Sequence, residues 1–190
     1  TVSLLIASEE ITSSLFGYGS FDYLSVKNSA NALFYFAFGL PAFSMIKIFS
    51  SFLFARHNTK IPFYFSVFSV ISNILISVSF FNKIGFIIIP IATTISSWLN
   101  VLLLIFYLNN KNYFSLNFVF YKSFLKIILS TILTSYIFLT LLNFFSNNLN
   151  YHSEYKLITI IFLVIVTFII YILISLITKA FKISDIKLKY

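Results

Sequence analysis

The chain has 190 residues, of which 59% are hydrophobic and 9% charged, with a net charge of +8 and a mean hydropathy of +0.98. No soluble domain of this length can bury so much apolar surface, so the composition predicts an integral membrane protein. The sequence contains no cysteine, which excludes a disulfide framework and a thiolate metal site.

Five apolar stretches follow one another along the chain, each long enough to cross about 30 Å of hydrocarbon. They lie at 29–54, 63–81, 84–108, 123–145 and 157–178. Residues 1–8 resemble the end of an earlier span, so we expect the sequence to be a fragment, and the mixed segment 9–20 suits the membrane interface. Because the apolar runs are continuous rather than alternating, a strand barrel is excluded. The predicted fold is all-α, a polytopic transmembrane helical bundle.

Each of the three prolines has a predicted place in these spans. Pro62 fits the first turn of its helix, where a missing N–H costs nothing. Pro41 and Pro90 fall inside spans, where we expect a kink and where neighbouring helices or hydroxyls can satisfy the freed carbonyls.

One charged residue, Lys47, lies inside the first full span. Placing a lysine at the centre of a membrane helix costs on the order of 2.5–3.5 kcal/mol, so such a residue usually faces protein or a watery cavity. Ser44, Ser50 and Ser51 share its side of the helix at a spacing of three or four residues. Lys47 lies nine residues before Arg56, about 13 Å along the helix. It therefore either lines a cavity with Ser44 and Ser51, or snorkels to the headgroups or makes a structural hydrogen bond.

Polar residues also share one face in each of the next two spans. These residues are Ser66, Ser69, Asn73 and Ser77 in one span, and Thr93, Ser97 and Asn100 in the other. They either hold helices together by hydrogen bonds or line a cavity, and the sequence leaves both open for Asn73 and Asn100. The last span has only scattered Thr159, Thr167 and Ser175, and we expect it to face lipid.

The basic residues alternate between loops instead of forming one patch, which argues against a nucleic-acid partner. Nine of the 13 fall on one side of the predicted bundle: Arg56, Lys60, Lys111, Lys122, Lys126, Lys179, Lys182, Lys187 and Lys189. By the positive-inside rule this side is cytoplasmic, and so is the carboxyl terminus.

The same topology argues against an enzyme. His57 and His152 fall on opposite sides of the membrane, no base lies within reach of the serines, and no carboxylate pair lies in a span. We expect no catalytic residue, no bound metal and no cofactor.

Four short motifs occur in order along residues 1–112. They are Leu15-Phe16-Gly17-Tyr18-Gly19-Ser20-Phe21, then Gly39-Leu40-Pro41-Ala42-Phe43 followed by Lys47, then Ala55 to Pro62, and Trp98-x-Asn100. They resemble the L-F-x-x-G-x-F, G-L-P-A-F-x-x-x-K, A-R-x-D-T-K-T-P and W-x-N motifs of the MurJ or MviN lipid II flippases, of the multidrug/oligosaccharidyl-lipid/polysaccharide exporter superfamily. Asn73 also falls where a family asparagine does. The third motif includes Arg56, Thr59, Lys60 and Pro62, with Asn58 in place of an aspartate and Ile61 in place of a threonine.

The resemblance implies the carboxy-terminal part of a fourteen-helix flippase in the bacterial inner membrane. Residues 1–112 would be the end of the second transport lobe, from the tail of helix 9 to helix 12. Residues 113–190 would be helices 13 and 14 with a basic cytoplasmic tail. The family is known to move the undecaprenyl-diphosphate-linked peptidoglycan precursor by alternating access, and the resemblance implies a monomer in full-length form. Among the residues present, Lys47 is the expected contact to the diphosphate.

Two alternatives remain open at this point. Another exporter of the superfamily, for polysaccharide-linked lipids or drugs, would share the fold, although no acidic residue for ion coupling lies in the five spans. A small membrane anchor or assembly subunit would be complete without further spans.

Overall fold

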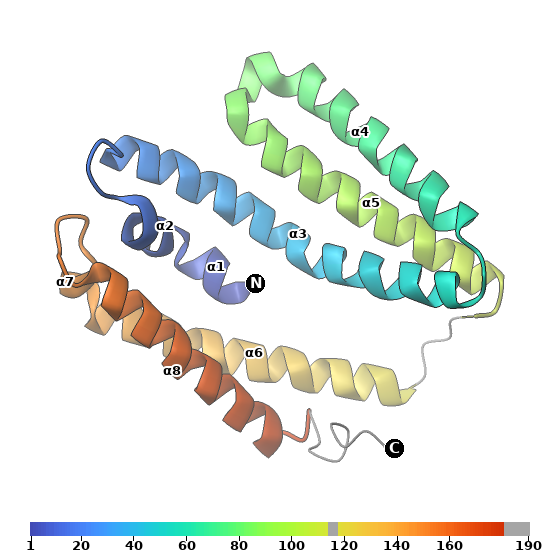
Figure 1. Cartoon of the computed structure of the whole chain (residues 1–190). Coiled ribbons are helices and arrows are strands. Elements are labelled where there is room, and N and C mark those ends of the chain that lie inside the picture. The colour runs from blue at the N-terminus through green and yellow to red at the C-terminus, as the bar shows by residue number, and fades with distance from the viewer. Residues whose placement is uncertain (114–117, 181–190) are drawn as a thin grey trace. The chain divides into compact units, whose positions relative to one another are not determined.

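A computed structural model of the chain describes residues 1–113 and 118–180. The basic residues Lys182, Lys187 and Lys189 of the predicted tail lie outside the described residues. The described residues form α1 (Val2–Ile6), α2 (Ser8–Phe16), α3 (Tyr23–Ala55), α4 (Lys60–Ile84), the short 3₁₀ helix η1 (Gly85–Ile87), α5 (Ile88–Asn110), α6 (Phe118–Phe144), α7 (Ser146–Leu149) and α8 (Lys156–Ile177). The prediction of an all-helical protein is confirmed over this part of the chain (Figure 1).

Four apolar helical runs in the described residues are long enough to cross a membrane: Tyr23–Ala55, Lys60–Asn110, Phe120–Phe144 and Lys156–Ile177. The second run has 51 residues and folds back on itself, with α4 packed along α5 in the opposite direction (Figure 1). Gly85 makes this reversal, with φ 73° and ψ −154°, a combination open almost only to glycine. The run therefore accounts for two of the five predicted spans.

The packing divides the chain into two units. The α3–α5 unit, residues 28–115, contains most of α3 with α4 and α5. The α6–α8 unit, residues 6–27 and 116–190, contains α2, the first residues of α3, α6, α7 and α8.

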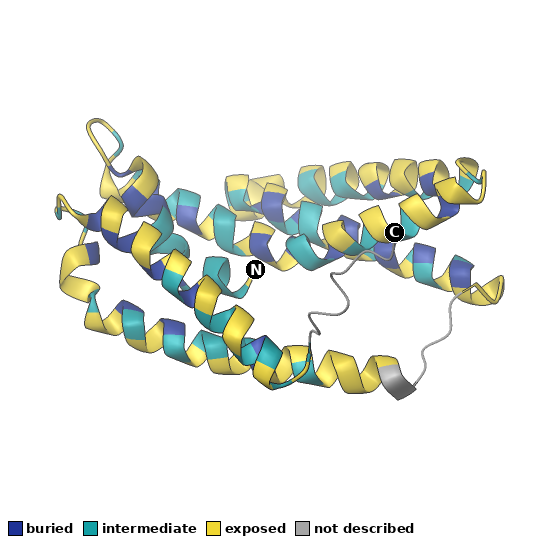
Figure 2. Ribbon diagram, turned by 60° about the horizontal axis from the view of Figure 1, so that its bottom comes forward, coloured by how far each residue is buried: buried dark blue, intermediate teal, exposed yellow. Residues whose placement is uncertain are grey.

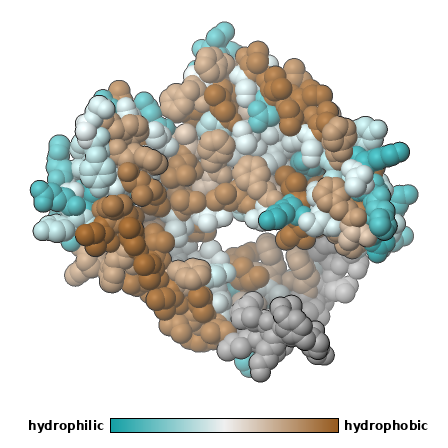
Figure 3. All heavy atoms as spheres, in the orientation of Figure 1, coloured by the Kyte–Doolittle hydropathy of each residue, from teal (hydrophilic) through white to brown (hydrophobic). Residues whose placement is uncertain are grey.

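Large apolar side chains are exposed along every long helix. Figure 2 shows how exposed positions recur along these helices. Val78, Leu102 and Ile158, each in a different helix, are between 64% and 72% exposed. On the face drawn in Figure 3, apolar residues cover much of the visible surface. Soluble proteins rarely leave such large apolar areas open, whereas in lipid they carry no penalty because the lipid tails are themselves apolar.

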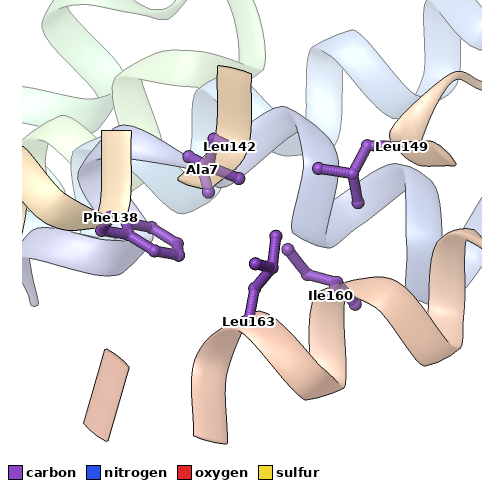
Figure 4. Packing of buried hydrophobic residues seen from close by; sticks show 6 residues of the cluster. All are labelled: Ala7, Phe138, Leu142, Leu149, Ile160 and Leu163. Carbon is purple, nitrogen blue, oxygen red and sulfur yellow. The ribbon is translucent and has the colours of Figure 1, made fainter. Parts of the chain in front are cut away.

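The α6–α8 unit has a compact core where α6, α7 and α8 meet. Phe138 and Leu142 of α6, Leu149 of α7, and Ile160 and Leu163 of α8 pack together with Ala7 (Figure 4). Thr159, Thr167 and Ser175 lie on the same buried side of α8, and the Thr167 hydroxyl donates to its own helix backbone at Leu163 O. One side of α8, which carries its scattered polar residues, therefore packs against protein, so the expectation that α8 faces lipid does not apply to that side.

Three helices end in the same backbone motif. At the end of α3, Asn58 N–H donates to Leu53 O and His57 N–H to Phe54 O, with His57 at φ 57°. Asn112 after α5 and Lys179 after α8 have φ 53° and the same pair of bonds. This is the Schellman arrangement, in which one left-handed residue satisfies the last carbonyls of a helix. These helix ends are thus fixed by backbone bonds.

The prolines only partly match their predicted places. Pro62 lies in the first turn of α4 and is buried, as expected. Pro41 lies inside α3, which continues through it. Pro90 was expected inside a span, but α5 begins at Ile88, so Pro90 lies in the first turn. That position needs no kink, because a first-turn N–H has no partner within the helix.

Candidate functional site

Lys47 and its neighbouring serines lie on an open side of α3. The side chains of Lys47, Ser44 and Ser51 are exposed, and the Ser44 hydroxyl donates to Leu40 O at 3.1 Å within the helix. Across the described residues, the Lys47 ammonium has no hydrogen bond or ion pair. A structural hydrogen bond therefore has no support within the described residues, while a cavity and snorkelling both remain open.

Asn73 bridges α4 and α5. Its amide nitrogen lies 3.0 Å from Thr93 Oγ1 and 3.4 Å from Ser96 Oγ, and its oxygen accepts from the Ser77 hydroxyl at 3.3 Å. One turn earlier in α4, the buried Ser69 hydroxyl donates to Ser96 O at 2.7 Å. These bonds support the role of interhelical hydrogen bonding that the sequence left open.

Asn73 also borders a pocket of about 380 Å³ in the α3–α5 unit. Phe43 and Ile46 of α3 line the same pocket, with polar side chains from α4 and α5 opposite. Asn73 thus holds two helices together and contributes a polar atom to a hollow beside α3. Asn100 differs, because it is buried and its oxygen has no hydrogen-bond partner in the described residues.

The second and fourth sequence motifs meet where α3 contacts α5. Trp98 Nε1 donates to Phe38 O at 3.0 Å, and the Thr94 hydroxyl donates to Tyr35 O at 2.7 Å. A Cβ on Gly39 would lie 3.1 Å from Thr94 Oγ1, closer than side chains normally approach. Gly39 is therefore the residue that lets α5 approach the motif of α3.

The third motif is anchored to the end of α5. The Arg56 guanidinium lies 4.1 Å from the centre of the Tyr113 ring and 4.8 Å from that of Phe52. Asn58 Nδ2 donates to the Tyr107 hydroxyl at 3.1 Å, and its Oδ1 accepts from Ile61 N–H at 3.4 Å. Asn58 thus ties this loop to α5.

Thr59 and Lys60 of the third motif are exposed, whereas Pro62 is buried. All three line a pocket of about 610 Å³, together with Ser50 and Phe63. The motif therefore places Arg56 against aromatic rings and leaves Lys60 beside an open pocket.

Lys156 is the most deeply buried charged residue in the described part of the chain, and the sequence did not single it out. Lys156 is the first residue of α8 and is 2% exposed. Its ammonium donates to Gly17 O at 2.6 Å and to Tyr151 O at 2.7 Å. It also lies 4.2 Å from the ring centre of Tyr18 and 4.7 Å from that of Tyr151. We call these partners the Lys156 cage.

The first sequence motif supplies half of this cage. A Cβ on Gly17 would lie 2.6 Å from Ser13 O, 3.0 Å from Tyr151 Cε2 and 3.3 Å from the Lys156 ammonium, so only glycine fits. The Tyr151 hydroxyl donates to Phe21 O at 2.7 Å, which holds this ring against the same sequence motif. A lysine directly before a long apolar run and shortly after two tyrosines, Tyr151 and Tyr155, was the one signal that could have indicated it.

The four motifs lie within the part of the chain that matches a known protein family. Residues 1–161 match the family model described as "Lipid II flippase MurJ". The chain belongs to the MurJ family. It is 34% identical over 107 residues to the probable lipid II flippase MurJ of Rickettsia prowazekii, covering 56% of this chain and 21% of that protein. It is also 35% identical over 102 residues to that of Rhizobium meliloti, covering 54% and 19%, and 35% over 96 residues to that of Thermotoga maritima, covering 50% and 20%.

The chain thus aligns with about a fifth of the length of these MurJ relatives. Its family and its apolar helices make it a multi-pass bacterial membrane protein.

Proposed function

We propose that this chain forms part of a flippase for lipid II, the undecaprenyl-diphosphate-linked precursor of peptidoglycan. The observation that carries the proposal is the match of residues 1–161 to the MurJ family model. Transport of a lipid with a large polar headgroup requires apolar outer surfaces beside inner ones that carry polar groups. The exposed apolar helices suit the first requirement, and the hollow at Asn73, whose lining includes polar side chains among apolar ones, suits the second. The proposed activity is transport by alternating access in bacterial cell wall synthesis, with no catalytic step.

We assign residues 1–112 to the end of the second transport lobe and residues 113–190 to two additional carboxy-terminal helices with a basic tail. In this arrangement the loops at 55–62 and 109–122 face the cytoplasm, because most basic residues lie on that side. The carboxyl terminus then lies inside the cell, and the complete transporter acts as a monomer.

Lys47 is the residue that we assign to the substrate headgroup. Its ammonium is exposed and has no partner in the described residues, and a lysine acts on a phosphate as a point charge. Ser44 and Ser51 lie on the same side of α3, and Asn73 borders a hollow next to that helix. We include Asn100 in this set because its buried side-chain oxygen has no hydrogen-bond partner in the described part of the chain.

The test places Lys47→Ala in the whole protein and measures growth of bacteria depleted of their own flippase, together with the amount of protein in the membrane. A hydrogen bond to a charged group contributes about 1.5–3 kcal/mol, so headgroup binding should weaken at least about tenfold while protein amount stays nearly normal. Lys47→Arg should impair growth less, because it retains the charge.

Lys83→Ala is the matched control, because Lys83 is an exposed lysine at the end of α4 whose nearest aromatic contact, to the Phe80 ring, is 5.9 Å long. This variant should grow normally. Normal growth of Lys47→Ala at normal protein amount would contradict the assignment, and a parallel loss of growth and protein would make Lys47 a structural residue.

A further inference from the structure

The α6–α8 unit has an acidic pocket away from the residues assigned above. It has a volume of about 280 Å³ and lies between α2, the first residue of α3, and the corner where α6 meets α7. Its polar lining consists of Glu9, Glu10, Ser13, Tyr23, Asn143, Ser146, Asn150 and Tyr151. None of its lining residues is basic, so no positive charge in the lining offsets the carboxylates of Glu9 and Glu10.

The two carboxylates differ in how they are held. Glu9 Oε1 accepts from the Tyr23 hydroxyl at 2.7 Å, which fixes that side chain at the edge of the pocket. Burial raises the pKa of Glu10, and the neighbouring Glu9 charge raises it further, although a backbone hydrogen bond acts in the opposite direction. A cation bound beside both carboxylates would favour their charged forms and offset the repulsion between them.

Acidic residues in the first turn of α2 would also be favourable for the helix dipole alone. That explanation does not account for Ser13, which lines the same pocket from the next turn of α2. Ser13 is only 5% exposed, and its hydroxyl has no hydrogen-bond partner in the described residues. A buried hydroxyl without a partner is costly, so this one points to a ligand in the pocket.

We propose that this pocket binds one divalent cation, through Glu9, Glu10, Ser13, Asn143 and Asn150, and so ties α2 to the corner of α6 and α7. The donors are all oxygen atoms, the set that Ca²⁺ and Mg²⁺ prefer. No group of three or more His, Cys, Asp or Glu that could hold a metal ion occurs in the described residues, so the proposed site has only two carboxylates, and neutral oxygens and water would complete its shell. A pocket of 280 Å³ has room for an ion with several of its waters.

The experiment uses Tb³⁺ as a luminescent probe on the whole protein in detergent. Tyr23 and Tyr151 line the pocket and can transfer excitation to the bound ion. We expect saturable Tb³⁺ emission that Ca²⁺ displaces far more effectively than Na⁺ or ethanolamine. Replacing both acids, Glu9→Gln with Glu10→Gln, should weaken Tb³⁺ binding by about tenfold or more, and Ser13→Ala by a few-fold.

Glu154→Gln is the matched control, because Glu154 is an exposed carboxylate outside the pocket. Its Tb³⁺ affinity should equal that of the unmodified protein. Equal affinities for the double variant and this control would overturn the proposal, and displacement by ethanolamine as effective as by Ca²⁺ would assign the pocket to an organic ammonium group instead. If the double variant does not fold, the displacement experiment on the unmodified protein still tests the proposal. Tb³⁺ emission that Ca²⁺ cannot displace would contradict a site for a divalent cation.

Discussion

Replacement of Lys156 by methionine tests the Lys156 cage most directly. Methionine has nearly the same length and flexibility as lysine but no charge, so it fills the same space without donating hydrogen bonds. The substitution leaves Gly17 O and Tyr151 O without the donor that now lies 2.6 and 2.7 Å away. It also removes the cation from the rings of Tyr18 and Tyr151.

The expected loss of stability follows from these contacts. Each buried carbonyl left without a donor costs about 1–3 kcal/mol. The two ring contacts contribute about 0.5–2 kcal/mol between them in a desolvated site. Against this, methionine avoids the desolvation of a buried ammonium, which costs several kcal/mol. We therefore expect Lys156→Met to lower the free energy of unfolding by about 2–4 kcal/mol.

The free energy of unfolding is measured by denaturant titration in detergent, followed by the helical circular dichroism signal. Lys83→Met, at an exposed lysine, is the control and should change stability by less than about 0.5 kcal/mol. Gly17→Ala should destabilise as well, and the double variant should lose less than the sum, because both changes act on one contact. Lys156→Met as stable as Lys83→Met would show that the cage contributes nothing and refute the reasoning.

Two further predictions concern the hairpin of α4 and α5 and the orientation in the membrane. Gly85→Ala should destabilise the protein by about 1–3 kcal/mol in the same titration, because its backbone angles are almost closed to alanine, whereas exposed Ser79→Ala should change little. Equal stabilities would show that the turn relaxes. A phosphatase fused at residue 58 should be inactive and one at residue 152 active, since the first position is predicted to face the cytoplasm. Activity at residue 58 would reverse the orientation.

Several features of this protein could be predicted from its sequence. The apolar runs give the five long helices in order, with ends that differ by up to six residues, because a chain in hydrocarbon must pair its own backbone groups within each span. Pro62 was placed correctly in a first turn, and the four motifs indicated the family that the family model also identifies. These features depend on residues close together in the chain, so a linear reading captures them.

Only the tertiary structure decided which side chains meet. Gly17 and Lys156 are 139 positions apart, and hydropathy gives no sign that the carbonyl of one holds the ammonium of the other. The same applies to Trp98 and Phe38, 60 positions apart, and to the position of Thr167 on the packed side of α8. Whether a charged or polar residue is buried depends on partners that folding brings together. In a sequence so rich in apolar residues, the pattern along one helix does not reveal which side of it those partners cover.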